Sequence, residues 1–334
     1  MNSVDTNNSS VIGLDVGTSR VVAARPNGQD FRYEIQLNSF VNIPFSRLTQ
    51  GVLQKEQVPQ TVEGAEITVF GNESERFAAL LNTDTRRPML RGRLNSEESE
   101  SLKLIREITS LLTGKAKNSE KLCFTVPAPS LGNEAGTTYH ESTLRRMLGE
   151  AGFEVMSINE GLAVVYSELQ DTNYTGIGIS CGGGLCNVCL SYLSVPIFSF
   201  SIPKAGDYVD SGAAKTTGER ANTIRLLKEQ SFHYNGDYSD QIRQALTTYY
   251  DDVISALVAA MNEAFAAAST LPKFPRAVPI VLSGGTAIPK GFRDRFEKAL
   301  RASNFPVPLS EIRQAPEPLT AAAKGALVAA LADL

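Results

Sequence analysis

A chain of 334 residues with a net charge of −4 can form one large α/β domain or two lobes of ordinary size. Its composition, 42% hydrophobic and 20% charged, is that of a globular protein, and the small negative charge gives no reason to expect direct nucleic-acid binding. No apolar run approaches the roughly 20 residues that span a bilayer, so we expect no direct membrane anchor. The four cysteines have no secretory context, which favours a cytoplasmic location.

The N-terminal third begins with a polar, Asn- and Ser-rich segment, residues 1–10, which we expect to be disordered. Strands are predicted at 11–15 and 20–24, joined by a tight turn. The pattern is then mixed to about residue 95, with a strand predicted at 67–71 and a helix at 73–81. The arginines at 86, 87, 91 and 93 are interpreted as part of a solvated loop that leads into a helix.

The next segment alternates helices and strands. Asn95 and Glu98 have the spacing of a capping box, followed by a helix that Gly114 ends. The apolar stripe of this helix is expected at Leu102, Ile105, Ile108, Leu111 and Leu112. Further elements are predicted at 122–126 (strand), 141–150 (helix), 153–158 (strand) and 160–169 (helix). This alternation favours a largely parallel sheet with helical cover.

The second half begins as the first does, with consecutive strands. They are predicted at 176–180, 185–191 and 195–201. A long helix follows at 239–269, whose apolar residues at spacings of three and four indicate a buried face. A strand at 277–282 and helices at 290–303 and 319–332 complete the chain. No low-complexity linker separates the halves, so we expect them to pack as one body.

A short phrase recurs at half-chain spacing. The sequence IGLDVGTS at 12–19 returns, with changes, as IGISCGGG at 177–184. Each copy is an apolar strand that ends in a glycine-rich turn, which indicates two similar halves facing one another across a cleft. The first copy carries a carboxylate at Asp15, whereas the second carries Ser180, so one of two acidic positions is missing.

Glycine-rich turns after buried strands are typical of phosphate sites, because small residues let backbone N–H groups approach phosphate oxygens. The two turns of the repeat qualify, and a third glycine pair at 284–285 stands between a strand and a helix. The Walker motif is absent, so the phosphate site would be of another kind. Three such turns predict a nucleotide site.

Seven segments resemble motifs of one family, in the order in which that family has them. Residues 12–19 and 179–184 resemble the two phosphate motifs of the actin, sugar-kinase and 70-kDa heat-shock chaperone superfamily, and 281–286 resembles the adenosine motif of actins. Residues 124–128 with 158–163 are similar to its first connecting segment. The segments 204–210 and 218–221 resemble bacterial shape-determining (MreB-like) actins. The set spans nearly the whole chain.

The resemblance implies a duplicated actin-like (ribonuclease H-like) α/β fold, with two lobes and a nucleotide cleft between them. Lobe I would cover 11–175 with an insertion at about 31–94, and lobe II would cover 176–318 with a helical insertion at about 211–270. A closing helix over 319–334 would pack back on lobe I.

The same resemblance implies ATP or ADP with Mg²⁺ as cofactors and assigns residues to them. Asp15 would lie beside the magnesium ion and the β- and γ-phosphates, and Glu160 would orient the water that attacks the γ-phosphate. The phosphates would contact Gly17, Thr18, Ser19, Gly182, Gly183 and Gly184. The ribose, the base and the adenosine side would contact Gly206, Asp207, Glu219, Gly284, Gly285 and Thr286.

This sequence departs from the family at Ser180, where an Asp is usual, and at Asn187, where an acidic residue is common. A hydroxyl supplies no charge to a magnesium ion held mainly through waters. Losing a charged acceptor costs about 1.5–3 kcal/mol, and each 1.4 kcal/mol is about tenfold in rate. We therefore expect hydrolysis to be slow, or lost with binding retained.

Three functions remain open at this point. The first is an actin-like cytoskeletal protein that binds ATP and polymerises with itself, reaching a membrane only through adaptor proteins. The second is a non-polymerising chaperone-like or regulatory scaffold with a degenerate ATPase site. The third is a small-molecule kinase of the same fold, for which a second general base and a substrate pocket are not evident. Fold alone does not choose among them.

Overall fold

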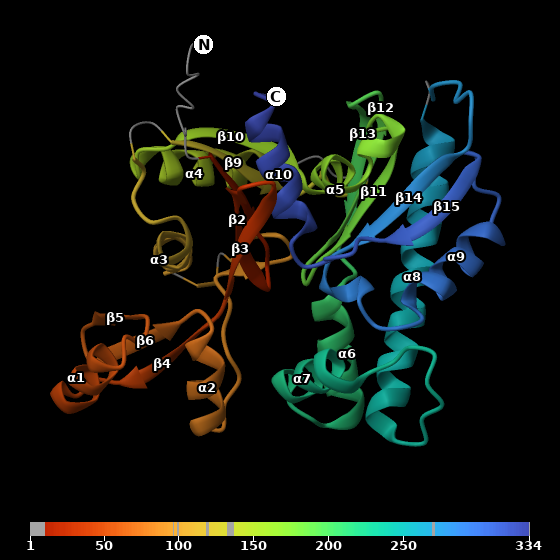
Figure 1. Ribbon diagram of the computed structural model, residues 1–334. Coiled ribbons are helices and arrows are strands. Elements are labelled where there is room, and N and C mark those ends of the chain that lie inside the picture. The colour runs from red at the N-terminus through yellow and green to blue at the C-terminus, as the bar shows by residue number, and fades with distance from the viewer. Residues whose placement is uncertain are drawn as a thin grey trace, which may run out of the picture.

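The computed structural model describes residues 11–95, 97–98, 100–117, 120–131, 137–268 and 271–333. The N-terminal segment 1–10, expected to be disordered, lies outside the described residues. Two five-stranded sheets stand side by side, each with helices on its faces, and a smaller group of elements lies below each sheet (Figure 1). No helix among the described residues is both long enough and apolar enough to cross a bilayer.

The first sheet has the strand order β10-β9-β1-β2-β3. β1 pairs in parallel with β9 and antiparallel with β2, and β2 pairs antiparallel with β3. The strands are β1 (Val11–Val16), β2 (Arg20–Asn27), β3 (Asp30–Leu37), β9 (Lys121–Val126) and β10 (Glu154–Asn159). β3 falls within the predicted insertion at about 31–94, yet it completes this sheet.

The second sheet repeats the plan of the first, with the order β13-β12-β11-β14-β15. β11 pairs in parallel with β14 and antiparallel with β12, as β1 does with β9 and β2. The strands are β11 (Gly176–Cys181), β12 (Cys186–Tyr192), β13 (Val195–Ile202), β14 (Val278–Ser283) and β15 (Leu309–Gln314). The shared plan confirms the predicted duplication and the α/β fold class.

Two helices, α5 (Glu160–Glu168) and α10 (Ala321–Leu331), pack against each other between the sheets (Figure 1). Equivalent glycines of the repeat let them approach the strands. A Cβ on Gly13 would lie 2.2 Å from the carbonyl oxygen of Ala323 in α10, and one on Gly178 would lie 2.2 Å from that of Gly161 in α5. The glycine of each repeat therefore allows a central helix to lie directly on its sheet.

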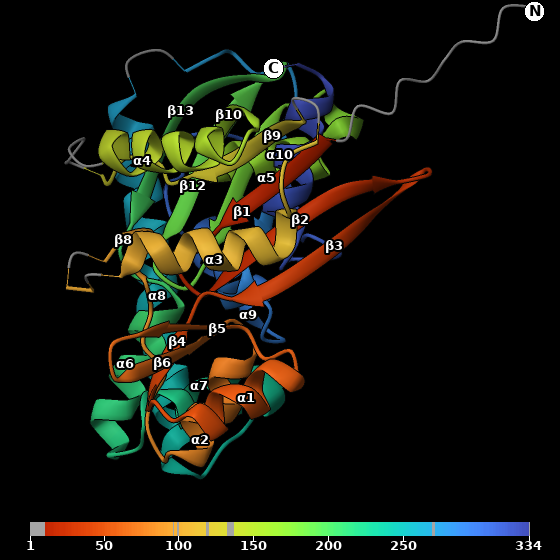
Figure 2. The ribbon, with the colours of Figure 1, turned by 90° about the vertical axis from the view of Figure 1, so that its left-hand side faces the viewer.

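Helices also cover the outer faces. Figure 2 shows α3 (Ser101–Thr113) and α4 (Thr137–Glu150) on the face of the first sheet that is turned away from the second. Phe265 of the long helix α8 (Gln241–Ala267) and Phe296 of α9 (Phe292–Arg301) belong to the core of the second sheet. The remaining core clusters lie under α3 and α4, around α5 and α10, and in the small group below the first sheet.

The small group below the first sheet has its own three-stranded sheet, in the order β4-β6-β5. It comprises β4 (Phe40–Pro44), α1 (Arg47–Lys55), β5 (Gln60–Glu63), β6 (Glu66–Phe70) and α2 (Glu73–Leu80), and the short pair β7 (Met89–Leu90) and β8 (Arg93–Leu94) follows. Below the second sheet lie α6 (Gly206–Thr217), α7 (Ala221–Ser231) and one end of α8 (Figure 1). Single turns of 3-10 helix occur at Gln170–Thr172 and Gly285–Ala287.

The predicted start and stripe of α3 were partly wrong. The helix begins at Ser101, and the side chain of Asn95 accepts a hydrogen bond from the Glu97 N–H at 3.1 Å, so Asn95 and Glu98 do not form a capping box. Leu104 is buried, whereas Leu111 is 45% exposed. The buried face runs through Leu104, Ile105, Ile108 and Leu112. Because each residue turns the helix by about 100°, Leu111 lies at the edge of that face.

Candidate functional site

A cavity of about 520 Å³ lies between the two sheets and the groups below them. This volume is within the range of small-molecule sites, roughly 300–1,000 Å³. All of the site residues predicted from the sequence line it, with the exception of Glu219. The lining therefore joins Asp15, Gly17, Thr18, Ser19, Glu160, Gly182, Gly183, Gly184, Gly206, Asp207, Gly284, Gly285 and Thr286.

The two turns of the repeat face each other at close range. A Cβ on Gly183 would lie 2.2 Å from the Ser19 Oγ, and one on Gly184 would lie 2.5 Å from the Thr18 Oγ1. The Thr18 hydroxyl in turn accepts a hydrogen bond from the backbone N–H of Gly92 at 2.9 Å. A side chain at Gly183 or Gly184 would therefore meet the side chains of the first turn.

A third turn, after β14, is tied to the second by hydrogen bonds. Thr286 Oγ1 donates to the carbonyl oxygen of Gly182 at 2.6 Å, and the backbone N–H of Gly206, at the start of α6, donates to the same oxygen at 3.1 Å. Gly284 has φ +87°, and a Cβ there would lie 2.2 Å from the Cys181 carbonyl oxygen. The geometry of this turn therefore requires glycine.

Two carboxylates lie at the end of the cavity where the strands of the repeat meet α5. Asp15 accepts a hydrogen bond from Thr125 Oγ1 at 2.5 Å. Glu160 is the first residue of α5, fixed there because the Asn159 side chain caps the helix by accepting from the N–H of Gly161 at 2.9 Å.

The predicted departures from the family contact Glu160 directly. Ser180 Oγ and Asn187 Nδ2 donate to Glu160 Oε2 at 3.1 and 2.8 Å. Burial raises the pKa of Asp15 to about 6, although the hydrogen bond from Thr125 acts to lower it. Burial, followed by the charge of Asp15, raises the pKa of Glu160 to about 8. Ser180 and Asn187 therefore act as hydrogen-bond donors that hold Glu160.

The donor set fits a magnesium ion held by few protein ligands. Mg²⁺ is usually bound through one or two carboxylates, with waters and substrate phosphates completing its shell. Asp15 supplies a carboxylate at the phosphate turns, and Ser180 supplies a neutral oxygen. Magnesium would therefore depend on Asp15 and on the phosphates of a bound nucleotide.

Charged residues that the sequence reasoning missed line the opposite side of the cavity. Lys228 of α7 pairs with Asp210 of α6 at 2.7 Å, and both side chains are buried. Arg225 pairs with Glu75 of α2, so α7 is tied to the group below the first sheet. The signal available in the sequence was the spacing of Arg225, Lys228 and Glu229, which places them on one face of α7.

Arg20, the first residue of β2, also lines the cavity. Its Nη2 donates to Glu229 Oε2 at 2.8 Å, and this pair joins the first sheet to α7. The sequence analysis did not single it out, although it directly follows the turn at 17–19.

Two expectations differ from what the structure shows. Glu219 is exposed in the connection between α6 and α7 and does not line the cavity. Arg87, interpreted as part of a solvated loop, instead pairs with Asp207 across the cleft. Glu229 of α7 lines the cavity, whereas Glu219 does not.

The fold is that of an actin-like protein. The structure resembles a MamK double helical filament subunit (TM-score 0.72, 18% identity, 97% of this chain and 99% of that chain). It also resembles MreB 5 of Spiroplasma citri bound to AMPPNP (TM-score 0.68, 15% identity, 98% and 97%) and the ethanolamine utilization protein EutJ from Carboxydothermus hydrogenoformans (TM-score 0.56, 15% identity, 96% and 89%). These likenesses confirm the two-lobed actin-like ATPase fold.

Within this fold, the sequence of the chain matches one particular family. The family model described as Volactin matches residues 11–330. The chain therefore belongs to the volactin family. No curated protein sequence matches it.

Proposed function

We propose that this protein is a cytoskeletal actin-like protein that binds ATP or ADP with Mg²⁺ in the cavity between its lobes and polymerises into filaments. The observation that carries the proposal is the cavity itself, where two glycine turns related by the internal repeat face one another. Solved structures of the same fold include the MamK filament and MreB 5 bound to AMPPNP, which support it.

In this proposal the phosphates lie between the turns at 17–19 and 182–184 and contact backbone N–H groups of these turns. The N–H groups of Gly17 and Gly182 are excluded, because they donate to the carbonyl oxygens of Arg20 and Leu185 at 2.9 Å. Asp15 lies beside the magnesium ion. The nucleoside extends toward the turn at 284–286 and α7, where Lys228 and Glu229 replace Glu219 as the charged residues of the lining.

Hydrolysis is proposed to be slow. Glu160 is proposed to orient the attacking water, but burial and the charge of Asp15 raise the pKa of its carboxyl to about 8, so that it is mostly protonated at neutral pH. A protonated carboxyl cannot accept a proton from water, so its contribution as a base is weak. The neutral Ser180 adds no carboxylate that would hold magnesium more firmly.

Polymerisation is proposed to follow from the lobes being held at one angle by the nucleotide. A fixed angle presents complementary surfaces on opposite ends of the molecule, and such heterologous contacts build open filaments. A change in the angle between the lobes would displace the predicted lobes, with their insertions, relative to one another. A cytoplasmic location and adaptor proteins belong to the same proposal.

A non-polymerising regulatory scaffold is the second candidate, favoured by Ser180 and Asn187, which leave Glu160 held and largely neutral. It predicts nucleotide binding without filaments. Electron microscopy therefore separates the two.

The test is negative-stain microscopy and pelleting of the protein with ATP, ADP or no nucleotide. Asp15→Ala is expected to weaken Mg²⁺-dependent ATP binding by at least about tenfold and to reduce pelleting at limiting ATP. Asp237→Ala, at an exposed aspartate that does not line the cavity, is the matched control and should behave as the wild type. Filaments that are equally abundant without nucleotide, or an Asp15→Ala variant of unchanged affinity, would contradict the proposal.

A further inference from the structure

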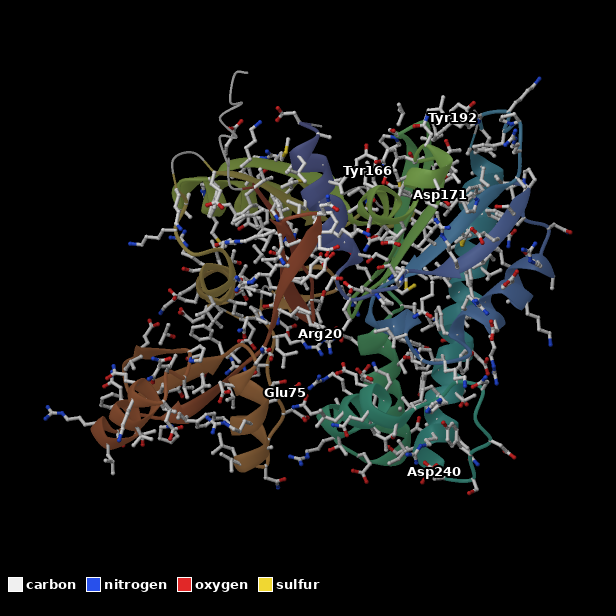
Figure 3. All side chains as sticks on the ribbon, viewed as in Figure 1. Arg20, Glu75, Tyr166, Asp171, Tyr192 and Asp240 are labelled. Carbon is white, nitrogen blue, oxygen red and sulfur yellow. The ribbon has the colours of Figure 1, made fainter. Side chains whose placement is uncertain are left out.

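Arg20 spans the cavity from one wall to the other. It follows directly the first phosphate turn, and its guanidinium contacts Glu229 on α7 at 2.8 Å. Its Nη1 also lies 3.6 Å from the position of a Cβ built on Gly285, at the third turn. Figure 3 shows Arg20 at the first sheet with its side chain toward the second lobe. The side chain therefore occupies the space between the walls that the proposed nucleotide would share.

Arg20 is the lining cation best able to change partner. Lys228 and Arg225 are each 8% exposed and are fixed by Asp210 and Glu75. The side chain of Arg20 is 22% exposed, and that of Glu229 is 33% exposed. Lys290 is exposed and follows the third turn, farther along the chain from the phosphate turns.

The pair with Glu229 is electrostatic and not part of an apolar core. Burial opposes ionisation of Glu229, yet the charges of Arg20 and Arg225 lower the pKa of this carboxyl below its usual value. Since Arg225 remains 3.6 Å from Glu229, this carboxylate keeps a cationic neighbour when Arg20 departs. Arg20 can therefore leave Glu229 without leaving the Glu229 carboxylate unpaired.

The first phosphate turn lies within reach of the guanidinium. Consecutive Cα atoms are about 3.8 Å apart, so Arg20 stands roughly 4 Å from Ser19 and at most roughly 11 Å from Gly17. The turn is closed, because the Gly17 N–H donates to the Arg20 carbonyl oxygen at 2.9 Å, and its residues therefore lie within reach of the arginine side chain. A planar guanidinium also matches two phosphate oxygens at once.

The negative charges in the site favour an arginine that can pair with phosphate. A nucleoside di- or triphosphate brings several negative charges to an end of the cavity that already holds Asp15 and Glu160. Because Ser180 and Asn187 are neutral, the described residues there supply less acidic charge to retain a divalent ion than two aspartates would. Positive charge from the protein itself would then contribute more of the binding free energy.

We propose that Arg20 leaves Glu229 when a nucleotide enters the cavity and pairs with its phosphates, so that this protein binds nucleoside diphosphates with little dependence on Mg²⁺. The inference rests on the proposed function, since it assumes that nucleotide binds between the lobes. It adds a phosphate-binding residue that follows, and is not part of, the glycine turns.

The experiment is calorimetric titration of ADP into the full chain, with Mg²⁺ or with EDTA. Removing Mg²⁺ should weaken wild-type binding by less than about tenfold. In EDTA, Arg20→Gln should bind at least about tenfold more weakly than the wild type, and Arg20→Lys should recover part of the loss. The control is Arg293→Gln on α9, whose exposed side chain pairs with Asp294 and lies outside the cavity lining.

Thermal melting of each variant shows whether it is folded. A double variant, Arg20→Gln with Glu229→Gln, removes the acid that the single variant leaves behind. It should stay weak in EDTA, whereas full recovery would assign the loss to repulsion by Glu229 and overturn the inference. Wild-type affinity of Arg20→Gln in EDTA, or a wild type that loses more than about 100-fold without Mg²⁺, would also overturn it. If the wild type does not bind ADP even with Mg²⁺, the proposed function fails and the inference fails with it.

Discussion

Glu160→Gln is expected to stabilise the nucleotide-free protein at neutral pH. The side chain keeps its size and can still accept the hydrogen bonds from Ser180 and Asn187, which lie at 3.1 and 2.8 Å from Glu160 Oε2. What it loses is the ability to ionise, which burial and the charge of Asp15 oppose in the folded protein. The isosteric amide of glutamine therefore removes the free-energy cost of burying an ionisable carboxyl and keeps the hydrogen bonds from Ser180 and Asn187.

The size and pH window of this gain follow from linkage. The carboxyl of Glu160 has a pKa of about 8 in the folded protein, against 4.5 without the fold. Between these pH values the folded state therefore binds more protons than the unfolded state. The stability that protonated Glu160 contributes is complete below pH 4.5 and is lost as pH rises through 8. At pH 7 the loss is at most about 3.5 kcal/mol, since one pKa unit is about 1.4 kcal/mol, and residual solvent contact reduces it.

The assay is urea unfolding of the wild type and Glu160→Gln at pH 5, 7 and 8. The variant should gain little at pH 5 and progressively more at pH 7 and 8. Glu150→Gln, an exposed glutamate at the end of α4, is the matched control and should show no such trend. A gain that is equal at all three pH values, or absent at pH 8, would refute the electrostatic reasoning.

Three further changes test other parts of the molecule. Gly325→Ala puts a Cβ 1.8 Å from a backbone carbonyl oxygen of α5 and should destabilise by about 1–3 kcal/mol or more, while Gly149→Ala in open space on α4 should stabilise by up to about 1 kcal/mol; equal unfolding midpoints would contradict this packing. Ser180→Asp should raise ATP turnover at saturating Mg²⁺, followed as phosphate release; no increase would show that the missing carboxylate does not limit hydrolysis. Burial lowers the pKa of His140 from 6.5 to about 4, so the folded state binds fewer protons in that window and stability should fall as pH drops from 6.5 to 4. His140→Phe should reduce this fall in urea unfolding, and an unchanged pH profile would count against it.

The sequence predicted the parts of the fold that local patterns determine. The strands β1 and β11 were found from their apolar runs and glycine turns, and their equivalent places in the two sheets confirm the repeat. Ser180 was recognised as a departure from the family. Its role as a donor to Glu160 could not be predicted, because that contact depends on how α5 is seated on β11.

Contacts between the lobes were beyond the reach of local patterns. Arg20 and Glu229 are separated by 209 residues, and Arg225 and Glu75 by 150. Such pairs are fixed by the relative position of the sheets and not by spacing along the chain. For the same reason Arg87, one of a basic run, was interpreted as solvated although it crosses to the second lobe.

The capping-box error has a different cause. Asn95 and Glu98 have the right residue types at the right spacing, but the chain turns at Asn95 and the helix starts only at Ser101. The carboxylate of Glu98 is engaged by Arg86 instead of a helix N-terminus. A side-chain partner outside the motif thus outweighs a local preference.

The central claim is that nucleotide lies between the two glycine turns of the internal repeat. Electron cryomicroscopy of the protein assembled with ATP and Mg²⁺ tests it most directly. The account predicts phosphate density between the turns at 17–19 and 182–184, with Arg20 moved from Glu229 toward it. Assemblies whose cleft holds no nucleotide, or nucleotide bound elsewhere on the chain, would contradict the account.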